Sequence, residues 1–324
     1  MTFLSKFAAI AAFTLSAHVN AGSIYFFGDS LSDTGNVSLA TNGAFPDPNL
    51  PYAPGQYTDK FGGGVWTAQF VSLLGQPSVM SAPSLAGGNN YAWAGATTGP
   101  GNVPGLGDQV AAYLNPVTGP AGASQASDLF AIVIGGNDLR AALVAAAQSG
   151  ANVPAIFSAA IANGMTIIDK AVKDLYNDQA RHFLISNMPD VSKAPETKTN
   201  GAGAVAGALL FEQLWNQAFT QEILSLSQLS GIDVDVLDLF GLAQRSNAFY
   251  AQAGITELNT PCFATANPAV SCPASFFSDT LHPSSAAHRL IALEARNAIP
   301  LPGSLALLMF GLFGVLFSLR KKLV

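Results

Sequence analysis

Two serines and two aspartates stand close together in the stretch FFGDSLSDTGN, which runs from residue 26 to residue 36. An apolar run ends there and small polar residues follow, as at the carboxyl end of a strand, where α/β enzymes gather their working groups. Gly28 permits a tight turn, and the hydroxyl of Ser30 could then face a cleft at the start of the next helix. Glycine, aspartate and serine are also ordinary turn and capping residues, so a nucleophilic serine needs support from the rest of the chain.

A serine nucleophile needs a base, which is usually a histidine. His182 begins an expected strand, at the wrong end of the sheet for a cleft, and His288 lies inside an expected helix, where a packing or surface role fits it better. His282 lies in the loop SDTLHP, three residues after Asp279. A turn can bring that carboxylate to one ring nitrogen and leave the other nitrogen to take the proton of Ser30. The same turn could instead serve only to cap the following helix.

Two further stretches offer donors for a developing oxyanion. IVIGGND places Asn137 directly after an apolar run, and one side-chain donor of this kind is typically worth about 3 kcal/mol. NYAWAGATT contains Gly95, whose backbone N–H could be a second donor. Each stretch alone is a weak signal, because Asn and Gly are common in turns.

Five β-like runs predict strands, and several of them are apolar throughout rather than alternating, as expected for strands covered on both faces. They are Ser23–Phe27, the weak run Pro77–Ser81, Asp128–Ile134, His182–Asn187 and Ile232–Leu237. Helical patterns cover residues 161–175, 204–229 and 285–297, the last after the start signals Pro283 and Ser284. This alternation predicts a parallel sheet with helices on both faces, in one domain over residues 22–297. The Gly-, Pro- and Asn-rich segment Thr41–Gly64 is expected to border the active site.

The composition of the 324-residue chain excludes some classes of protein. Hydrophobic residues make up 49% and charged residues 10%, but continuous apolar runs occur only at the two ends. A net charge of -6 with 14 Lys and Arg argues against a nucleic-acid partner, which needs a clustered basic surface. No cofactor is expected, and the dispersed histidines predict no metal site.

The two ends of the chain indicate export. Residues 1–21 have the layout of a secretory signal that signal peptidase cuts after Ala21, although a buried first helix is the alternative. Gly303–Leu319 is uncharged and is followed by Arg320, Lys321 and Lys322. This tail is long enough for a short membrane span whose basic end stays in the cytoplasm. The two ends together place the body of the chain outside the inner membrane.

Cys262 and Cys272 are the two cysteines of the chain. In an oxidising envelope we expect them to form a disulfide, whose loop would contribute about 3 kcal/mol in the chain-entropy model. A two-cysteine metal site is the alternative, but it would need further ligands and the loop contains no histidine.

Taken in order, FFGDSLSDTGN, NYAWAGATT, IGGND and SDTLH resemble the four blocks of the GDSL, or SGNH, hydrolases. The resemblance implies a three-layer αβα sandwich of the flavodoxin-like SGNH-hydrolase fold with about five parallel strands. It implies Ser30 as nucleophile, His282 as base and Asp279 as its orienter, with Ser30, Gly95 and Asn137 forming the oxyanion hole. Ser32 is set aside and Asp29 is left to brace the turn. Ala94 departs from the pattern, which often has a second glycine there, and its methyl group could narrow the acyl entrance.

Residues 298–324 resemble the C-terminal sorting signals of the PEP-CTERM type, which combine a Pro-x-Pro motif, an apolar helix and a basic end. Leu301 stands where the best-known version has Glu. The resemblance implies an exosortase-like processing enzyme in a Gram-negative envelope and a final place in the periplasm, on the cell surface or in the extracellular matrix. A permanent C-terminal membrane anchor is the alternative.

The predicted activity is therefore hydrolysis of carboxylic esters, with lipid or short-chain acyl groups, through an acyl-serine intermediate. A phospholipase or lipid acyltransferase that uses the same site is the alternative, because softer matches point to the lipase-like and haemolysin-like branch of the family. A non-catalytic surface or matrix protein is a third hypothesis, which the complete set of site residues disfavours.

Overall fold

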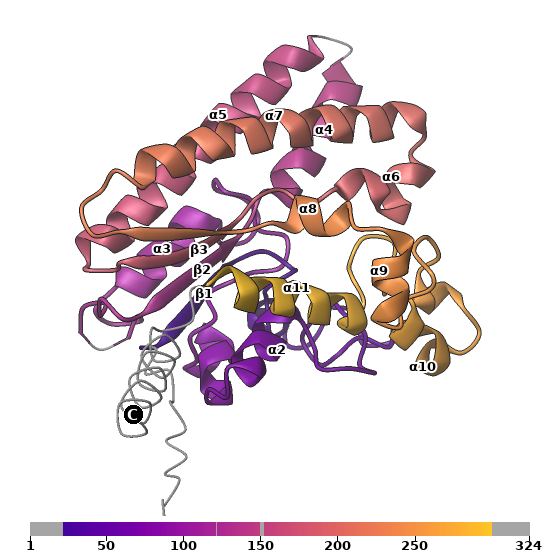
Figure 1. Cartoon of the computed structure of the whole chain (residues 1–324), viewed down its shortest axis with the longest axis horizontal. Coiled ribbons are helices and arrows are strands. Elements are labelled where there is room, and N and C mark those ends of the chain that lie inside the picture. The colour runs from indigo at the N-terminus through magenta and orange to yellow at the C-terminus, as the bar shows by residue number, and fades with distance from the viewer. Residues whose placement is uncertain (1–21, 121, 150–151, 300–324) are drawn as a thin grey trace, which may run out of the picture. The chain divides into compact units, whose positions relative to one another are not determined.

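Four parallel strands form one sheet, and each strand pairs with the next one along the chain (Figure 1). In spatial order they are β1 (Ile24–Gly28), β2 (Leu129–Val133), β3 (His182–Ser186) and β4 (Asp233–Leu237). The register sets Gly28 opposite Val133, so the carboxyl ends of β1 and β2 coincide. Functional groups that follow these strands are thereby brought to one end of the sheet.

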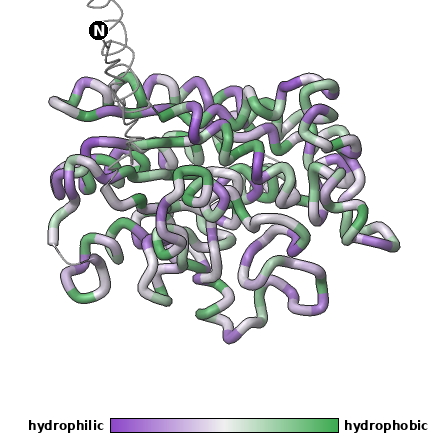
Figure 2. The backbone as a smooth tube through the Cα atoms, turned by 60° about the horizontal axis from the view of Figure 1, so that its bottom comes forward, coloured by the Kyte–Doolittle hydropathy of each residue, from purple (hydrophilic) through white to green (hydrophobic). Residues whose placement is uncertain are grey.

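The computed structural model describes residues 22–120, 122–149 and 152–299. The predicted signal peptide, residues 1–21, lies outside the described residues, as does the predicted tail from residue 300 onward. Along the described chain, hydrophobic and hydrophilic residues are interspersed, as the hydropathy colours of Figure 2 show.

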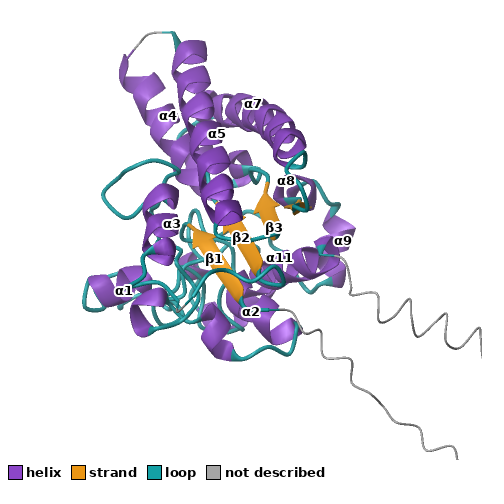
Figure 3. Cartoon of the chain, turned by 90° about the vertical axis from the view of Figure 1, so that its left-hand side faces the viewer, coloured by secondary structure: helices purple, strands orange, loops and turns teal. Residues whose placement is uncertain are grey.

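Helices cover both faces of the sheet, which makes the fold a three-layer αβα sandwich (Figure 3). One face is covered by α3 (Leu106–Leu114), α4 (Gly136–Ser149), α5 (Val153–Asn177) and α7 (Ala202–Leu226). The other is covered by α2 (Trp66–Leu73), α8 (Leu239–Ala243), α9 (Asn247–Gln252) and α11 (Ser285–Ala298). Short elements lie in the connections: α1 (Asn36–Ala40), α6 (Pro195–Thr199), α10 (Pro268–Ser271), and the 3-10 turns η1 (Ser78–Ser81), η2 (Ser84–Ala86), η3 (Val191–Lys193), η4 (Cys262–Ala264) and η5 (Cys272–Ala274).

Strand β1 is apolar throughout because it is buried on both faces. Tyr25 and Phe27 point into the core beneath α3, α5 and α7, whereas Ile24 and Phe26 point into the core beneath α2 and α11. All four side chains are buried, because successive residues of a strand face opposite sides of the sheet and both sides are covered.

Two predicted helices become the long pair α5 and α7, which pack against each other over one face of the sheet (Figure 1). Asn152 caps the start of α5 by accepting a hydrogen bond from the N–H of Ala155. By length and composition α5 is the one helix of the described ranges that could cross a membrane. Its apolar stripe, which includes Ile161, Ile168 and Leu175, is instead buried in the core.

The prediction of a strand at Pro77–Ser81 is wrong, because this run forms the 3-10 turn η1. Pro77 and Pro83 flank it and have no N–H to donate to a strand ladder, and local bonds such as Met80 N–H to the Pro77 carbonyl take over. A different segment lies along the outer edge of β1. Tyr91 N–H bonds to the Phe26 carbonyl, and Asn90 forms a parallel bridge with Phe26. This irregular segment occupies the place of a fifth strand, in the flavodoxin-like order 2-1-3-4-5.

Candidate active site

The turn after β1 presents Ser30 at the carboxyl end of the sheet. Gly28 ends the strand with φ at +147°, and a Cβ there would lie 2.0 Å from the carbonyl oxygen of Val133, so the turn requires glycine. The side chain of Gln109 fixes the backbone of this turn with two hydrogen bonds of 2.8 Å. It accepts one from the N–H of Gly28 and donates the other to the carbonyl of Gly28. The local sequence thus builds a tight, braced turn with a serine at its tip.

His282 and Asp279 lie beside this serine. Nε2 of His282 is 2.9 Å from Oγ of Ser30, and Nδ1 of His282 is 2.7 Å from Oδ2 of Asp279. With the ring proton on Nδ1 facing the carboxylate, Nε2 is free to accept the proton of Ser30. The structure brings together three residues that the sequence indicated separately, with Ser30 and His282 separated by 252 positions in the chain.

The carboxylate of Asp279 is held in its charged form. Its Oδ1 accepts hydrogen bonds from the backbone N–H groups of Leu281 and His282, each at 2.7 Å. Burial alone would raise its pKa, but the hydrogen bonds and charge of His282, together with the hydroxyl of Tyr52, outweigh burial and lower the pKa to about 2. Asp279 is therefore ionised at neutral pH, as an orienter of a histidine must be.

Ser30, Gly95 and Asn137, the three predicted donors, line one cavity. Among the described residues, the backbone N–H groups of Ser30 and Gly95 have no hydrogen-bond partner. Asn137 donates one hydrogen of its side-chain amide to the Ala96 carbonyl at 2.8 Å, which orients the amide and leaves its second hydrogen available. Preorganised donors of this kind can stabilise a developing negative charge.

The buried Asp33 and the partly buried Asp138 fix the loop that carries Gly95. Asp33 accepts hydrogen bonds from the N–H of Ala94 at 2.9 Å and from the N–H groups of residues 35–37. Asp138, beside Asn137, accepts from the backbone and the hydroxyl of Thr98. Gly95 thus lies between two anchored positions, with φ at +85°, a left-handed conformation that favours glycine.

A family model for GDSL-like lipase/acylhydrolase matches residues 24–295, and one for the PEP-CTERM protein-sorting motif matches residues 298–322. The chain belongs to the GDSL-like lipase/acylhydrolase family. The sorting motif indicates export and a place in the envelope or outside a Gram-negative cell.

Two individual proteins are similar to this GDSL family member. Thermolabile hemolysin of Vibrio parahaemolyticus serotype O3:K6 (strain RIMD 2210633) is 25% identical in an alignment of 289 residues, and the match covers 83% of this chain and 62% of the hemolysin. The chain thus spans about three fifths of the length of this curated relative. The crystal structure of the acetyl xylan esterase AlAXEase superimposes on 86% of this chain and 99% of that one, with 11% identity and a TM-score of 0.41.

The other polar residues of the first GDSL block have structural contacts. Ser32 is fully buried and its hydroxyl accepts from the indole N–H of Trp66 at 3.0 Å. Asp29 accepts from Leu31 N–H at 3.0 Å, so it braces the turn as expected. Burial raises the pKa of Asp29 to about 7.

The two remaining described histidines have partners other than Ser30 and Asp279. His182 begins β3 and faces Asp233 at 3.5 Å. His288 is fully buried in α11, where Nδ1 accepts from Trp66 N–H at 3.1 Å. Burial, with the charge of His282 as a second cause, lowers the pKa of His288 to about 3. It is a packing residue, one of the two roles that the sequence indicated for it.

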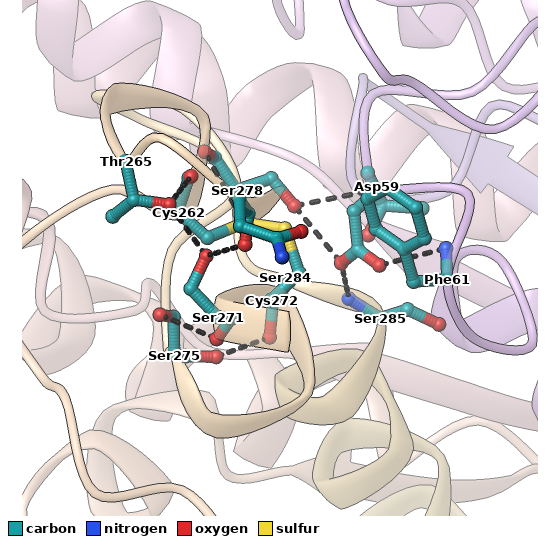
Figure 4. The surroundings of a disulfide bond; sticks show 12 residues. Asp59, Phe61, Cys262, Thr265, Ser271, Cys272, Ser275, Ser278, Ser284 and Ser285 are labelled. Carbon is teal, nitrogen blue, oxygen red and sulfur yellow. Dashed lines mark hydrogen bonds between the residues drawn. A yellow bond between two sulfur atoms is a disulfide. The ribbon is translucent and has the colours of Figure 1, made fainter. Parts of the chain in front are cut away.

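The disulfide between Cys262 and Cys272 lies beside the loop that leads to Asp279 and His282; Figure 4 shows its surroundings. The N–H groups of Cys262 and Phe263 bond to the carbonyls of Phe277 and Ser278, directly before Asp279. Asp59 bonds to both the hydroxyl of Ser278 and the N–H of Ser285 (Figure 4). The loop is therefore fixed on two sides.

Two cavities meet at Ser30. One, of about 370 Å³, extends toward α8, α9 and α11, and the other, of about 630 Å³, extends toward Tyr52, Tyr57 and Phe263. Asn137 and His282 line both cavities, and Ala94 lines the second. Leu50, Tyr52 and Tyr57 show that the segment Thr41–Gly64 borders the site.

Sequence reasoning missed Tyr52, whose hydroxyl donates to Oδ2 of Asp279 at 2.5 Å. It also missed Asp33 and Asp138 as anchors of the Gly95 loop. The two aspartates lie inside matched blocks, which is a signal that could have drawn attention to them; nothing local distinguishes Tyr52 from its neighbours. No group of three or more His, Cys, Asp or Glu side chains suited to a metal ion occurs in the described part of the chain.

Proposed function

We propose that this GDSL family member hydrolyses carboxylic esters through an acyl-serine intermediate. The observation that carries the proposal is the continuous series of contacts from Ser30 Oγ to His282 and from His282 to Asp279, at 2.9 and 2.7 Å. These distances are hydrogen-bond distances, which a nucleophile, its base and an orienter require.

In the first half-reaction, Oγ of Ser30 attacks the ester carbonyl carbon while Nε2 of His282 takes the hydroxyl proton. The carbonyl oxygen becomes negative and accepts hydrogen bonds from the N–H groups of Ser30, Gly95 and Asn137. As the tetrahedral species collapses, the bond to the alkoxy oxygen breaks and His282 returns the proton to the leaving alcohol. Asp279 stays ionised and stabilises the imidazolium that forms between these two proton transfers.

In the second half-reaction, water attacks the acyl carbon of the ester on Ser30. His282 takes a proton from that water and gives it to Oγ of Ser30, which releases the carboxylic acid. If an alcohol replaced water at this step, the same residues would transfer the acyl group instead of hydrolysing it.

A lipid ester is the substrate class that we favour. Apolar side chains such as Leu239, Leu242 and Phe276 line the smaller cavity next to Ser30, which suits a hydrocarbon chain. The similarity to a protein named hemolysin supports the same choice.

Paired substitutions test the proposal. Ser30→Ala and His282→Ala should each lower hydrolysis of p-nitrophenyl acyl esters by at least about 10³-fold, with thermal unfolding unchanged. Ser72→Ala and His182→Ala, which remove the same groups away from the site, should keep the parental rate. Parental turnover in both site variants would reject the mechanism.

The place of the protein in the envelope has a separate test. We propose that signal peptidase removes residues 1–21 and that an exosortase-like enzyme removes the basic end of the tail. Mass spectrometry of the mature protein from its host measures both ends. An intact terminus at Arg320–Val324 would reject processing and favour the permanent anchor.

A further inference from the structure

Both apolar and basic side chains line the smaller cavity beside Ser30. Its apolar part comes from α8, α9 and α11 and includes Leu242, Tyr250 and Ile291. Four of the 14 Lys and Arg residues of the chain line the same cavity: Arg140, Lys193, Lys198 and Arg245. Such a concentration is unexpected in a chain with a net charge of -6.

The four cations come from four separate segments. Arg140 lies on α4, Lys193 in η3, Lys198 on α6, and Arg245 between α8 and α9. A run of charges along one helix would be an ordinary solvated surface, but convergence of separate segments on one cavity is typical of a recognition site. Arg140 also lines the second cavity, so it stands where the two cavities meet beside Ser30.

The acidic side chains of the cavity do not neutralise this charge. The carboxyl groups that line it are those of Asp29 and Asp190, both buried. Asp190 already accepts hydrogen bonds from Ser192 and Gln244, and lies 3.4 Å from Lys193. The excess of positive charge therefore remains on the other cations.

Two of those cations are free of carboxylate partners. Lys198 donates to the neutral side chain of Asn259 at 2.7 Å, and Arg245 lies over the ring of Phe249. Within the described ranges neither forms an ion pair, whereas Arg140 pairs with Glu196 at 2.7 Å. Lys198 and Arg245 are thus available to a bound anion, which they would hold by charge-assisted hydrogen bonds.

We infer that this cavity recognises an anionic amphiphile, namely an ester whose molecule carries both a hydrocarbon chain and an anionic group such as a phosphate. The hydrocarbon lies against Leu242, Tyr250 and Ile291, and the anionic group lies between Lys198 and Arg245. The inference rests on the proposed function and deepens it, because it distinguishes anionic from neutral or zwitterionic lipid esters as the preferred substrates.

The test compares esters with equal acyl chains and different headgroups, presented to the full chain in micelles of a neutral detergent. The substrates are didecanoyl phosphatidylglycerol, which is anionic, didecanoyl phosphatidylcholine, which is zwitterionic, and neutral didecanoylglycerol. We expect kcat/KM to be at least about tenfold higher for the anionic ester than for either other ester, and this preference to shrink as salt screens the charges.

The double variant Lys198→Gln/Arg245→Gln should lower the anionic-to-zwitterionic ratio of kcat/KM by at least about fivefold. Its matched control is Lys170→Gln/Lys173→Gln, which removes two positive charges from α5, away from the cavity, and should keep the ratio. An equal loss in both doubles would show a general effect of net charge and overturn the inference. An unchanged ratio in the Lys198/Arg245 double would overturn it as well.

A binding measurement separates this inference from the proposed function. Calorimetry with the Ser30→Ala full chain measures binding of phosphatidylglycerol micelles, phosphatidylcholine micelles and inorganic phosphate without requiring turnover. Preferential binding of the anionic micelles supports the inference even if no ester is cleaved, in which case only the proposed function fails. Equal binding of both micelles overturns the inference. Inorganic phosphate that binds as tightly as the anionic micelles shows a free-anion site, which also overturns it.

Discussion

The hydroxyl of Tyr52 and the imidazole of His282 share one oxygen of Asp279. Tyr52 Oη lies 2.5 Å from Oδ2 and His282 Nδ1 lies 2.7 Å from the same atom. The ring of Tyr52 packs edge-on against Phe263, which is next to the disulfide-bonded Cys262, with centroids 4.9 Å apart. Tyr52 therefore connects the disulfide loop to the orienter of the proposed base, and we assign it a positioning role.

Tyr52→Phe should lower kcat/KM for a p-nitrophenyl ester by about tenfold, or about 1.4 kcal/mol, because the carboxylate loses one of its fixed donors. KM should change little. The downfield proton resonance of His282 Nδ1 should also shift, which a purely structural role of the hydroxyl would not cause.

Tyr57→Phe is the matched control. Tyr57 packs against the imidazole of His282 with ring centroids 4.8 Å apart, and the phenylalanine keeps that contact. In the described chain its hydroxyl makes no hydrogen bond to Asp279. Equal losses in the two variants would contradict a specific role of the Tyr52 hydroxyl.

Asn137→Ala should lower kcat by about 10²-fold or more and leave KM almost unchanged, because an oxyanion-hole donor acts mainly in the transition state. The exposed Asn177→Ala at the end of α5 is the control. Steady-state kinetics on one chromogenic ester measures both. An unchanged kcat would remove Asn137 from the proposed oxyanion hole.

Gly28→Ala should destabilise the protein and abolish hydrolysis. The added Cβ would meet the Val133 carbonyl at 2.0 Å, so the carboxyl ends of β1 and β2, which position Ser30 and Asn137, would have to separate. We expect a loss of at least about 2 kcal/mol in the free energy of unfolding, measured by denaturant titration.

Gly203→Ala is the control for that substitution. Gly203 lies in the first turn of α7 and an added Cβ would meet nothing within 4 Å. The alanine should be neutral or should stabilise the helix by up to about 1 kcal/mol. If both glycine variants unfold at the parental denaturant concentration, the close approach at Gly28 is not a constraint on the fold.

His288 should make stability depend on pH. Its folded pKa is lowered to about 3, so the folded protein keeps the ring neutral where the unfolded chain, with a pKa of 6.5, takes up a proton. Stability is therefore fully present above pH 6.5 and is lost as the pH falls below it, at about 1.4 kcal/mol per pH unit.

His288→Asn isolates this contribution, because the asparagine oxygen can still accept from Trp66 N–H. The variant should be less stable than the parent at pH 8, and the gap between the two should narrow as the pH falls from 6.5 to 5. Denaturant titration at several pH values measures the gap. A gap that stays constant over this range would contradict the assignment of a neutral buried ring.

Much of the fold could be predicted because its signals are local. The apolar runs of β1, β2 and β3 and the periodic face of α5 reflect burial on one or both sides, which hydrophobic spacing records directly. The run at Pro77–Ser81 failed because its β-like residues lie between prolines that cannot join a ladder. Its place beside β1 is taken by the polar segment around Asn90, whose composition does not indicate a strand.

The candidate site also has a part that local sequence signals predict and a part that they do not. Asp279 and His282 are three positions apart, so one turn joins them. The chain has few histidines, which left few candidates for the base, and the matched blocks then indicated Ser30 as its partner. Tyr52 lies 227 positions from Asp279, and the cations of the smaller cavity come from four segments. The sequence by itself determined the four strands β1 to β4, the long helices and the candidate residues, because these depend on local spacing and residue type. Only the tertiary structure decided which loops meet at Ser30, because contacts between distant segments depend on how the whole core packs.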